Sequence, residues 1–396
     1  RAKYELQREI RKAKWEYRQK LEAQFQSGNS RAVWHGLQTV TDYKKRSSPA
    51  DADPTLPDKL NEFYGRFDRD NTTPVTVSFP DPASPLPPPF VVSEQVVRML
   101  LRKQNSRKAA GPDGVSAPTL RHCADQLSPV LADLFNSSLQ LSTVPRCFKS
   151  STIVPVPKKT KVTSLNDYRP VALTSLVMKA LERLVLKHIQ SIVSSKLDPL
   201  QFAYQANRSV DDAVAFALHY VLQHLESPSR YVRLLFIDYS SAFNTIVPQK
   251  LFDKLQLFDL SSSICFWILD FLLQRPQTVK INNLLSKTTI LSTGAPQGCV
   301  LSPLLYCLFT NDCVSSHDSV QLVKFADDTT VEGLITNGDE TAYRQEVDRL
   351  VSWCDDNKLQ LNASKTKEMV VDFRRMKGPV DPLVVNGETI ETVNCF

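Results

Sequence analysis

Three aspartates are placed where the sequence could support metal-dependent chemistry. Asp327 and Asp328 are adjacent within "KFADDTTV" (324–331), and Asp238 ends the apolar run "YVRLLFID" (231–238). Adjacent carboxylates repel each other and Asp is a common turn residue, so a solvated turn is the simplest interpretation of the pair. Mg²⁺, however, prefers oxygen ligands. Two such ions about 4 Å apart can activate a hydroxyl and stabilise a leaving oxygen in phosphoryl transfer.

Strands are predicted to position these carboxylates. The β-prone residues on both sides of Asp327 and Asp328 predict two strands that meet at a tight turn. The apolar residues 231–237 predict a buried strand that ends at Asp238. Separation along the chain says nothing about distance in space, so a shared metal site requires that this strand end and this turn meet in the fold.

Five segments bear on the choice between a turn and a metal site. They are "STIVPVPKK" (151–159), "NDYRPVALTS" (166–175), "FIDYSSAFNTI" (236–246), "GAPQGCVLSPLLYCLFTND" (294–312) and "FADD" (325–328). Together and in this order they resemble the reverse transcriptases, in particular the polymerases of non-LTR (LINE-type, jockey-like) retrotransposons. The resemblance runs from about Arg107 to Asn394 and favours the metal-site interpretation. It implies an RNA-directed DNA polymerase that transfers nucleotides from dNTPs to a primer 3′-hydroxyl.

The resemblance also implies catalytic roles by position. Asp238 and Asp327 match the principal metal ligands, and Asp328 matches the neighbouring carboxylate. The expected cofactor is a pair of Mg²⁺ ions, for which Mn²⁺ can substitute. Lys365, in "LNASKTKEMVVDF" (361–373), matches the lysine that is thought to protonate the leaving pyrophosphate. Lys367 is the alternative, because it lies two residues further along the same segment.

A second group of residues is expected to bind the incoming dNTP. The resemblance assigns this role to Lys158, Arg169, Tyr239, Phe243, Gln297 and Gly298. Phe243 lies where the family has an aromatic ring that excludes a 2′-hydroxyl, although an ordinary core phenylalanine is the simpler interpretation of the residue alone. The guanidinium of Arg169 suits a triphosphate, although isolated surface cations are usually solvated.

The implied fold is α+β, a right-hand polymerase with an antiparallel palm sheet backed by helices and a truncated thumb. The expected divisions are a basic helical extension (1–46), a Pro-rich linker (47–91), fingers (92–230), palm (231–375) and the start of the thumb or primer-grip region (376–396). The chain has no initial Met and ends on "ETVNCF". We therefore expect it to be a piece of a longer protein.

Composition and charge are those of an ordinary globular protein with a basic start. Hydrophobic residues make up 42% of the 396 residues, and charged residues 23%. Of the net charge of +6, residues 1–46 hold a surplus of +7, from 12 Lys and Arg against 5 Asp and Glu. Such an arm can bind nucleic-acid phosphates, or it can be a solvated helix. The eight cysteines form no C-x-x-C pair, which predicts reduced thiols and no zinc site.

The expected partners are template RNA, primer or target DNA, and dNTPs, with no membrane because no apolar run is long enough to span one. We expect an intracellular protein, in the nucleus and cytoplasm by resemblance, although no targeting signal is visible. Two alternatives remain. An RNA-dependent RNA polymerase would usually have Gly-Asp-Asp and a polar gate residue where this chain has Ala326 and Phe243. A decayed or truncated copy that only binds RNA is disfavoured by the three intact aspartates.

Overall fold

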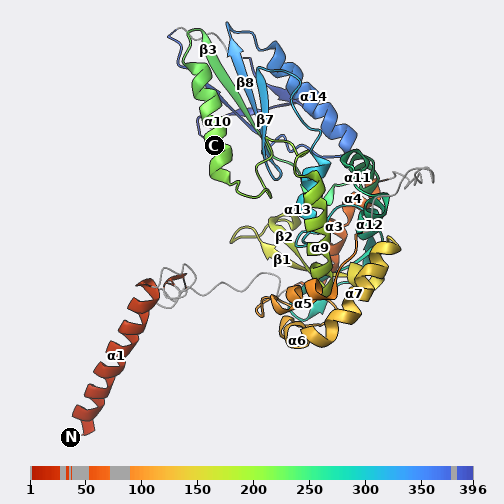
Figure 1. The fold of residues 1–396 in the computed structure, drawn as a ribbon. Helices are drawn as coiled ribbons and strands as arrows, with labels where there is room; N and C mark the ends of the chain where they lie inside the picture. The colour runs from red at the N-terminus through yellow and green to blue at the C-terminus, as the bar shows by residue number, and fades with distance from the viewer. Residues whose placement is uncertain are drawn as a thin grey trace. The chain divides into compact units, whose positions relative to one another are not determined.

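The computed structural model describes residues 2–26, 33–34, 37, 53–71, 90–375 and 381–395. The chain divides into two compact units, residues 1–54 and 55–396. In the first unit, the predicted basic extension contains helix α1 (Ala2–Gln26), most of whose described side chains are exposed (Figure 1). Residues 72–89, the most Pro-rich part of the predicted linker, lie outside the described residues.

The second unit contains two mixed β-sheets, of which sheet I carries the aspartates. Its strand order is β12–β9–β3–β8–β7, with bounds β3 (Arg230–Ile237), β7 (Val320–Phe325), β8 (Asp328–Thr336), β9 (Lys367–Val371) and β12 (Glu391–Thr392). Neighbouring strands are antiparallel except β9 and β12, which run parallel. The predicted hairpin around Asp327 and Asp328 and the predicted strand before Asp238 are therefore confirmed.

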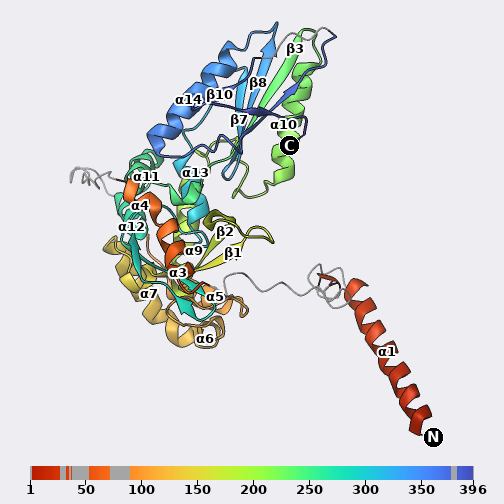
Figure 2. The ribbon, with the colours of Figure 1, turned by 180° about the vertical axis from the view of Figure 1, so that it is seen from behind.

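Helices α10 (Val210–Leu225) and α14 (Thr341–Asn357) pack against sheet I (Figures 1 and 2). The ring of His224 on α10 hydrogen-bonds to the carbonyl of Ile335 at 3.0 Å. On the strand β8, a Cβ at Gly333 would lie 2.4 Å from the ring of Tyr343 on α14. A glycine is therefore needed there for the helix and the sheet to meet this closely.

Sheet II joins two segments that lie on either side of β3 in the sequence. It comprises β1 (Ser151–Pro157), β2 (Tyr168–Thr174), β4 (Arg275–Ile281), β5 (Leu284–Leu285) and β6 (Thr289–Leu291). Strands β1 and β4 are parallel, and the other pairs are antiparallel. The boundary predicted between residues 230 and 231 does not separate the two sheets, because β4, β5 and β6 belong with sheet II while α10 packs on sheet I.

The remaining helices, with the short hairpin β10 (Val384–Val385) and β11 (Glu388–Thr389), complete the α+β fold. The helices are α5 (Glu94–Arg102), α6 (Ala117–His122), α7 (Ala124–Gln140), α8 (Arg146–Lys149), α9 (Leu176–Val193), α11 (Pro248–Leu255), α12 (Ser262–Leu272) and α13 (Ser302–Phe309). Five of the eight cysteines are buried, and all eight are free. In the described part of the chain, every helix is too short or too polar to cross a bilayer.

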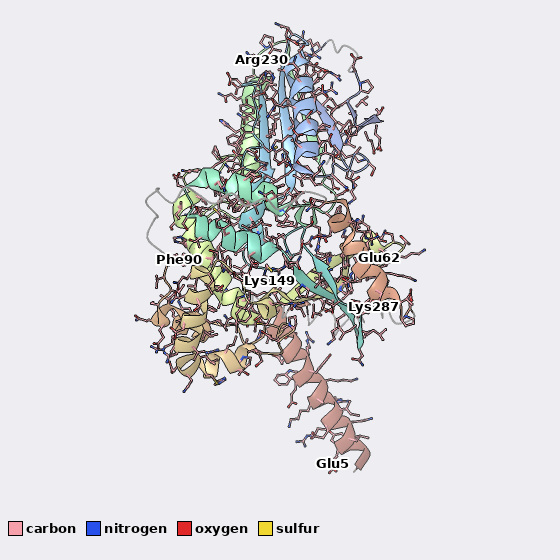
Figure 3. All side chains as sticks on the ribbon, turned by 90° about the vertical axis from the view of Figure 1, so that its right-hand side faces the viewer. Glu5, Glu62, Phe90, Lys149, Arg230 and Lys287 are labelled. Carbon is pink, nitrogen blue, oxygen red and sulfur yellow. The ribbon has the colours of Figure 1, made fainter. Side chains whose placement is uncertain are left out.

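Two helices occupy part of the predicted linker, α3 (Leu56–Tyr64) and α4 (Arg66–Asp70). Leu60, Tyr64 and Phe67 are buried, at the spacing of one helical face. This stripe packs α3 against β4, and Figure 3 shows Glu62 of α3 near Lys287 of the β5–β6 connection. The linker prediction is therefore wrong for residues 55–71, because the polar and Pro-rich flanks obscured a short amphipathic pattern.

Candidate active site

A cavity of about 770 Å³ collects most of the predicted site residues. Residues that line it come from the β1–β2 hairpin, the end of β3, the β7–β8 turn and the segments after β6 and before β9. Nine of the ten predicted residues line it, namely Lys158, Arg169, Asp238, Tyr239, Phe243, Gln297, Gly298, Asp327 and Lys365. Asp328 is the exception among them.

Asp238 is positioned by the segment that precedes β9. The carbonyl of Asp238 accepts a hydrogen bond from the backbone N–H of Asn362 at 2.9 Å, and its own N–H lies 3.4 Å from the hydroxyl of Thr366. Lys365 belongs to this segment, and its Nζ lies 3.6 Å from Oδ2 of Asp238. The end of β3 and the segment of Lys365 are thus held together by one backbone hydrogen bond and one contact with the Thr366 hydroxyl.

Asp327 lies in the two-residue turn between β7 and β8, which the pair Phe325–Asp328 closes. Ala326, the first turn residue, has a φ of 58°, a left-handed conformation that is uncommon for a residue with a Cβ. The side-chain amide of the buried Gln201 holds it, because Oε1 accepts the N–H of Ala326 at 3.0 Å and Nε2 donates to its carbonyl at 3.3 Å. Gln201 therefore fixes the turn that presents Asp327.

The three aspartates influence one another electrostatically. Burial is the main cause that raises the pKa of Asp327, and the nearby Asp238 raises it further while Arg169 lowers it. Burial, Asp327 and Asp238 together raise the pKa of Asp328. This arrangement disfavours the charged forms of Asp327 and Asp328. A cation at this position would offset that cost.

The donor atoms suit a divalent ion that is shared with a substrate. Among the described residues, no group of three or more His, Cys, Asp or Glu side chains could hold a metal ion by itself. Mg²⁺ at phosphoryl-transfer sites commonly takes one or two protein carboxylates and completes its shell with water and substrate phosphates. Asp238 and Asp327 fit this pattern, since Oδ2 of Asp238 is buried and has no hydrogen-bond partner in the described part of the chain. Asp328 is exposed and lies outside the cavity lining.

Cationic side chains from the β1–β2 hairpin also line the cavity. Arg169 is exposed and, within the described ranges, makes no side-chain hydrogen bond or ion pair. Partial burial lowers the pKa of Lys158, and the positive charges of Lys365 and Arg169 lower it further. These neighbours disfavour the charged form of Lys158, so an anion placed beside it would be stabilised.

Phe243 and the loop of Gln297 and Gly298 form another part of the lining. The ring of Phe243 packs against Tyr306 with centroids 4.9 Å apart, and it is partly buried. The carbonyl of Gln297 accepts the N–H of Ala172 on β2 at 2.8 Å. Gly298 has a φ of 121°, and a Cβ there would lie 2.7 Å from the Ala172 carbonyl oxygen. The glycine thus permits the loop to lie directly on sheet II.

Tyr239 and Lys367 have surroundings that differ from those of the other predicted site residues. Tyr239 is only 9% exposed, and burial raises the pKa of its phenol, which lies near Cys354 and Cys313 in the core. Lys367 does not line the cavity; its Nζ bonds to Glu391 at 2.7 Å and to the carbonyl of Ser364 at 2.9 Å. Of the two candidate lysines, Lys365 therefore faces the cavity and Lys367 does not.

Several residues at the site were not found from the sequence. Gln201 supports the turn of Asp327. Tyr204 lines the cavity, where burial, and after it the charge of Asp327, raises the pKa of its phenol. Arg66 of α4 also lines it. Nothing in the residue types marks Gln201 or Tyr204, whereas the buried stripe of α3 and α4 was a signal for the region of Arg66.

Comparisons with known proteins found a matching family profile and related proteins. The profile of the family described as "Reverse transcriptase (RNA-dependent DNA polymerase)" matches residues 156–386. The chain is 26% identical over 316 residues to the "RNA-directed DNA polymerase from mobile element jockey" of Drosophila melanogaster, covering 76% of this chain and 34% of that protein. It is 26% identical over 298 residues to the "Probable RNA-directed DNA polymerase from transposon BS" of the same species, covering 72% and 33%. It spans about a third of the length of these relatives.

Proposed function

This chain belongs to the reverse transcriptase family, and from that premise we propose that it is an RNA-directed DNA polymerase of a jockey-like non-LTR retrotransposon. Its reaction would be attack of a primer 3′-hydroxyl on the α-phosphate of a dNTP, directed by an RNA template, with pyrophosphate as the leaving group. The partners are the template RNA, the primer or target DNA, and the dNTPs.

One observation carries the proposal: Asp238 and Asp327 line the same cavity as several cationic side chains. The two aspartates come from different strand ends of sheet I, and Arg169 with Lys158 comes from sheet II. A site with carboxylates on one side and cations on the other suits a metal-bound triphosphate. We assign sheet I with α10 and α14 to the palm, and sheet II with its surrounding helices to the fingers.

Asp238 and Asp327 would hold two Mg²⁺ ions, for which Mn²⁺ can substitute, and Asp328 would contribute charge beside them. When bound, such ions supply activation of the 3′-hydroxyl and stabilisation of the leaving oxygen. Arg169 and Lys158 would bind the triphosphate, and Nζ of Lys365 would donate a proton to the pyrophosphate. Gln297 and Gly298 would lie against the nucleotide and template, and Phe243 beneath the sugar. Tyr239 would support the site from the core.

Primer extension on poly(rA)/oligo(dT) with dTTP and Mg²⁺ tests the proposal. The chain should extend the primer, and Asp238→Asn should not. Asp348→Asn is the matched control, because Asp348 is exposed on α14 and outside the cavity. RNA binding without extension, by both the chain and a longer protein that contains it, would favour the alternative of an RNA-binding protein. Extension with UTP in preference to dTTP would favour an RNA polymerase.

A further inference from the structure

Helices α3 and α4 are fixed to sheet II by a set of buried and partly buried hydrogen bonds. The amide of Asn61, which is 2% exposed, donates to the carbonyl of Lys287 at 2.8 Å and to the hydroxyl of Thr289 at 2.9 Å. Its Oδ1 accepts from Nε2 of Gln277 at 2.9 Å. Asp68 of α4 accepts the backbone N–H of Ser292 at 2.6 Å. The two helices are thus a rigid part of the second unit.

This anchored pair presents Arg66 to the cavity. The guanidinium lies between two aromatic rings, 3.9 Å from the centroid of Phe63 and 4.1 Å from that of Phe67. One terminal nitrogen donates to the carbonyl of Phe63 at 2.6 Å, and the other reaches the hydroxyl of Ser241 at 3.4 Å. A planar guanidinium held in this way has a defined orientation, which a flexible lysine ammonium would not have.

The contact with Ser241 falls at a strained point of the backbone. Ser241 has φ 58° and ψ 45°, a left-handed conformation that is unfavourable for a residue with a Cβ. Its carbonyl accepts the N–H of Asn244 at 2.7 Å, and the carbonyl of Phe243 accepts the N–H of Ala295 at 2.8 Å. The turn that carries Phe243 is therefore held from one side by the loop at Ala295 and from the other by Arg66.

We propose that Arg66 is a positioning residue that fixes the Ser241–Phe243 turn and thereby sets the discrimination between deoxynucleotides and ribonucleotides. The inference rests on the proposed polymerase function and on the gate role of Phe243. It makes α3 and α4 part of the nucleotide site. Without the guanidinium, the strained turn can relax, and the ring of Phe243 loses its fixed height beneath the sugar.

Competition of dTTP against UTP on the same primed template tests this inference. Arg66→Gln should lower the ratio of kcat/KM for dTTP to that for UTP by roughly 3- to 10-fold, as expected for loss of one or two hydrogen bonds. Arg66→Lys keeps the charge but not the planar fork, so it should not restore the ratio. Arg69→Gln is the matched control, because Arg69 lies on the same helix and pairs at the surface with Glu62 at 3.0 Å.

A double-mutant cycle separates positioning from other roles. Ser241→Ala removes the hydroxyl acceptor, so the combination with Arg66→Gln should lower the ratio by less than the product of the two single effects. Equal losses of kcat/KM for both nucleotides, or full rescue by Arg66→Lys, would overturn the inference. Either result would mean that Arg66 contributes only its positive charge. Inactivity of both the unaltered chain and a longer protein that contains it would instead refute the proposed function. Thermal unfolding of each variant shows whether a loss comes from misfolding.

Discussion

At the scale of single residues, Asp327 should favour catalysis and oppose folding. Burial and Asp238 raise its pKa, so its charged form is disfavoured in the folded state when no cation is bound. Asp327→Asn should therefore abolish extension, by at least about 100-fold as for loss of an essential catalytic group. It should leave RNA affinity unchanged and, without divalent ions, leave the melting temperature equal or higher. A clear drop in that temperature would mark Asp327 as a structural residue.

Phe243 gives a second prediction at this scale. Its ring is partly buried against Tyr306 and also lines the cavity. The ring can therefore belong to the core and also exclude a 2′-hydroxyl from the cavity. Overpacking a tight site costs about 1–3 kcal/mol, or roughly 5- to 150-fold in relative efficiency. Phe243→Ala should admit UTP by a factor in this range while dTTP incorporation persists. Phe243→Tyr keeps the ring and is the control. If Phe243→Ala selected dTTP over UTP as well as the parent does, another residue would have to exclude the 2′-hydroxyl.

At the scale of elements, strand β8 contains a buried carboxyl that lacks a partner among the described residues. Both oxygens of Glu332 are buried without a hydrogen bond there, and burial raises its pKa to about 7. Gln321 lies directly opposite on β7, and within the same ranges its Oε1 is also without a partner. The folded state thus binds the carboxyl proton of Glu332 more tightly than the unfolded state does. The free energy of unfolding therefore falls as the pH rises from about 4.5 to about 7.

Glu332→Gln should therefore stabilise the protein at pH 8, by on the order of 2–3 kcal/mol, and change little near pH 4.5. Chemical unfolding at both pH values measures the difference. Glu388→Gln, at an exposed position of β11, is the matched control and should change neither. If the unfolding free energy of Glu332→Gln followed that of the parent at every pH, the carboxyl would have to be hydrated in solution.

The same elements show how far the sequence could predict the structure. The hairpin of Asp327 and the strand before Asp238 follow from local patterns, because β-prone residues and a tight turn are signals within a few residues. The parallel pairing of β1 with β4 leaves no local signal, since it joins segments more than 100 residues apart. The amide of Gln201 and the turn at Ser241 likewise depend on partners from distant segments. Most residues of the site were predictable, whereas the residues that hold them in place were not.

At the scale of the whole molecule, the basic first unit should bind nucleic acid independently of the reaction that we propose for the second unit. Deleting residues 1–54 removes the basic surplus and leaves α3 in place. For every phosphate that the shortened chain no longer neutralises, the log–log salt slope of RNA binding should flatten by about 0.7–0.9. We expect the slope to change by several units. Incorporation of dTTP on a saturating template should be retained. An unchanged slope would assign α1 to another partner.

Deleting residues 1–71 provides the comparison for that truncation. This deletion also removes α3 and α4, and with them the buried side chains of Leu60 and Asn61 that pack on sheet II. The longer deletion should lower the melting temperature, whereas the shorter one should not. Equal melting temperatures for the two truncated chains would contradict the anchoring of these helices.

The central position of β3 in sheet I also governs how the protein can be made. Both neighbours of β3, strands β8 and β9, are synthesised after it, and β9 begins 130 residues (367 − 237) beyond its last residue. At about 5–20 residues per second, a ribosome needs roughly 7–26 s to cover that interval. During this time Val232, Leu235 and Ile237, all buried in the finished protein, lack their final neighbours. A nascent chain therefore exposes an apolar strand, to which chaperones can bind, well before sheet I can form.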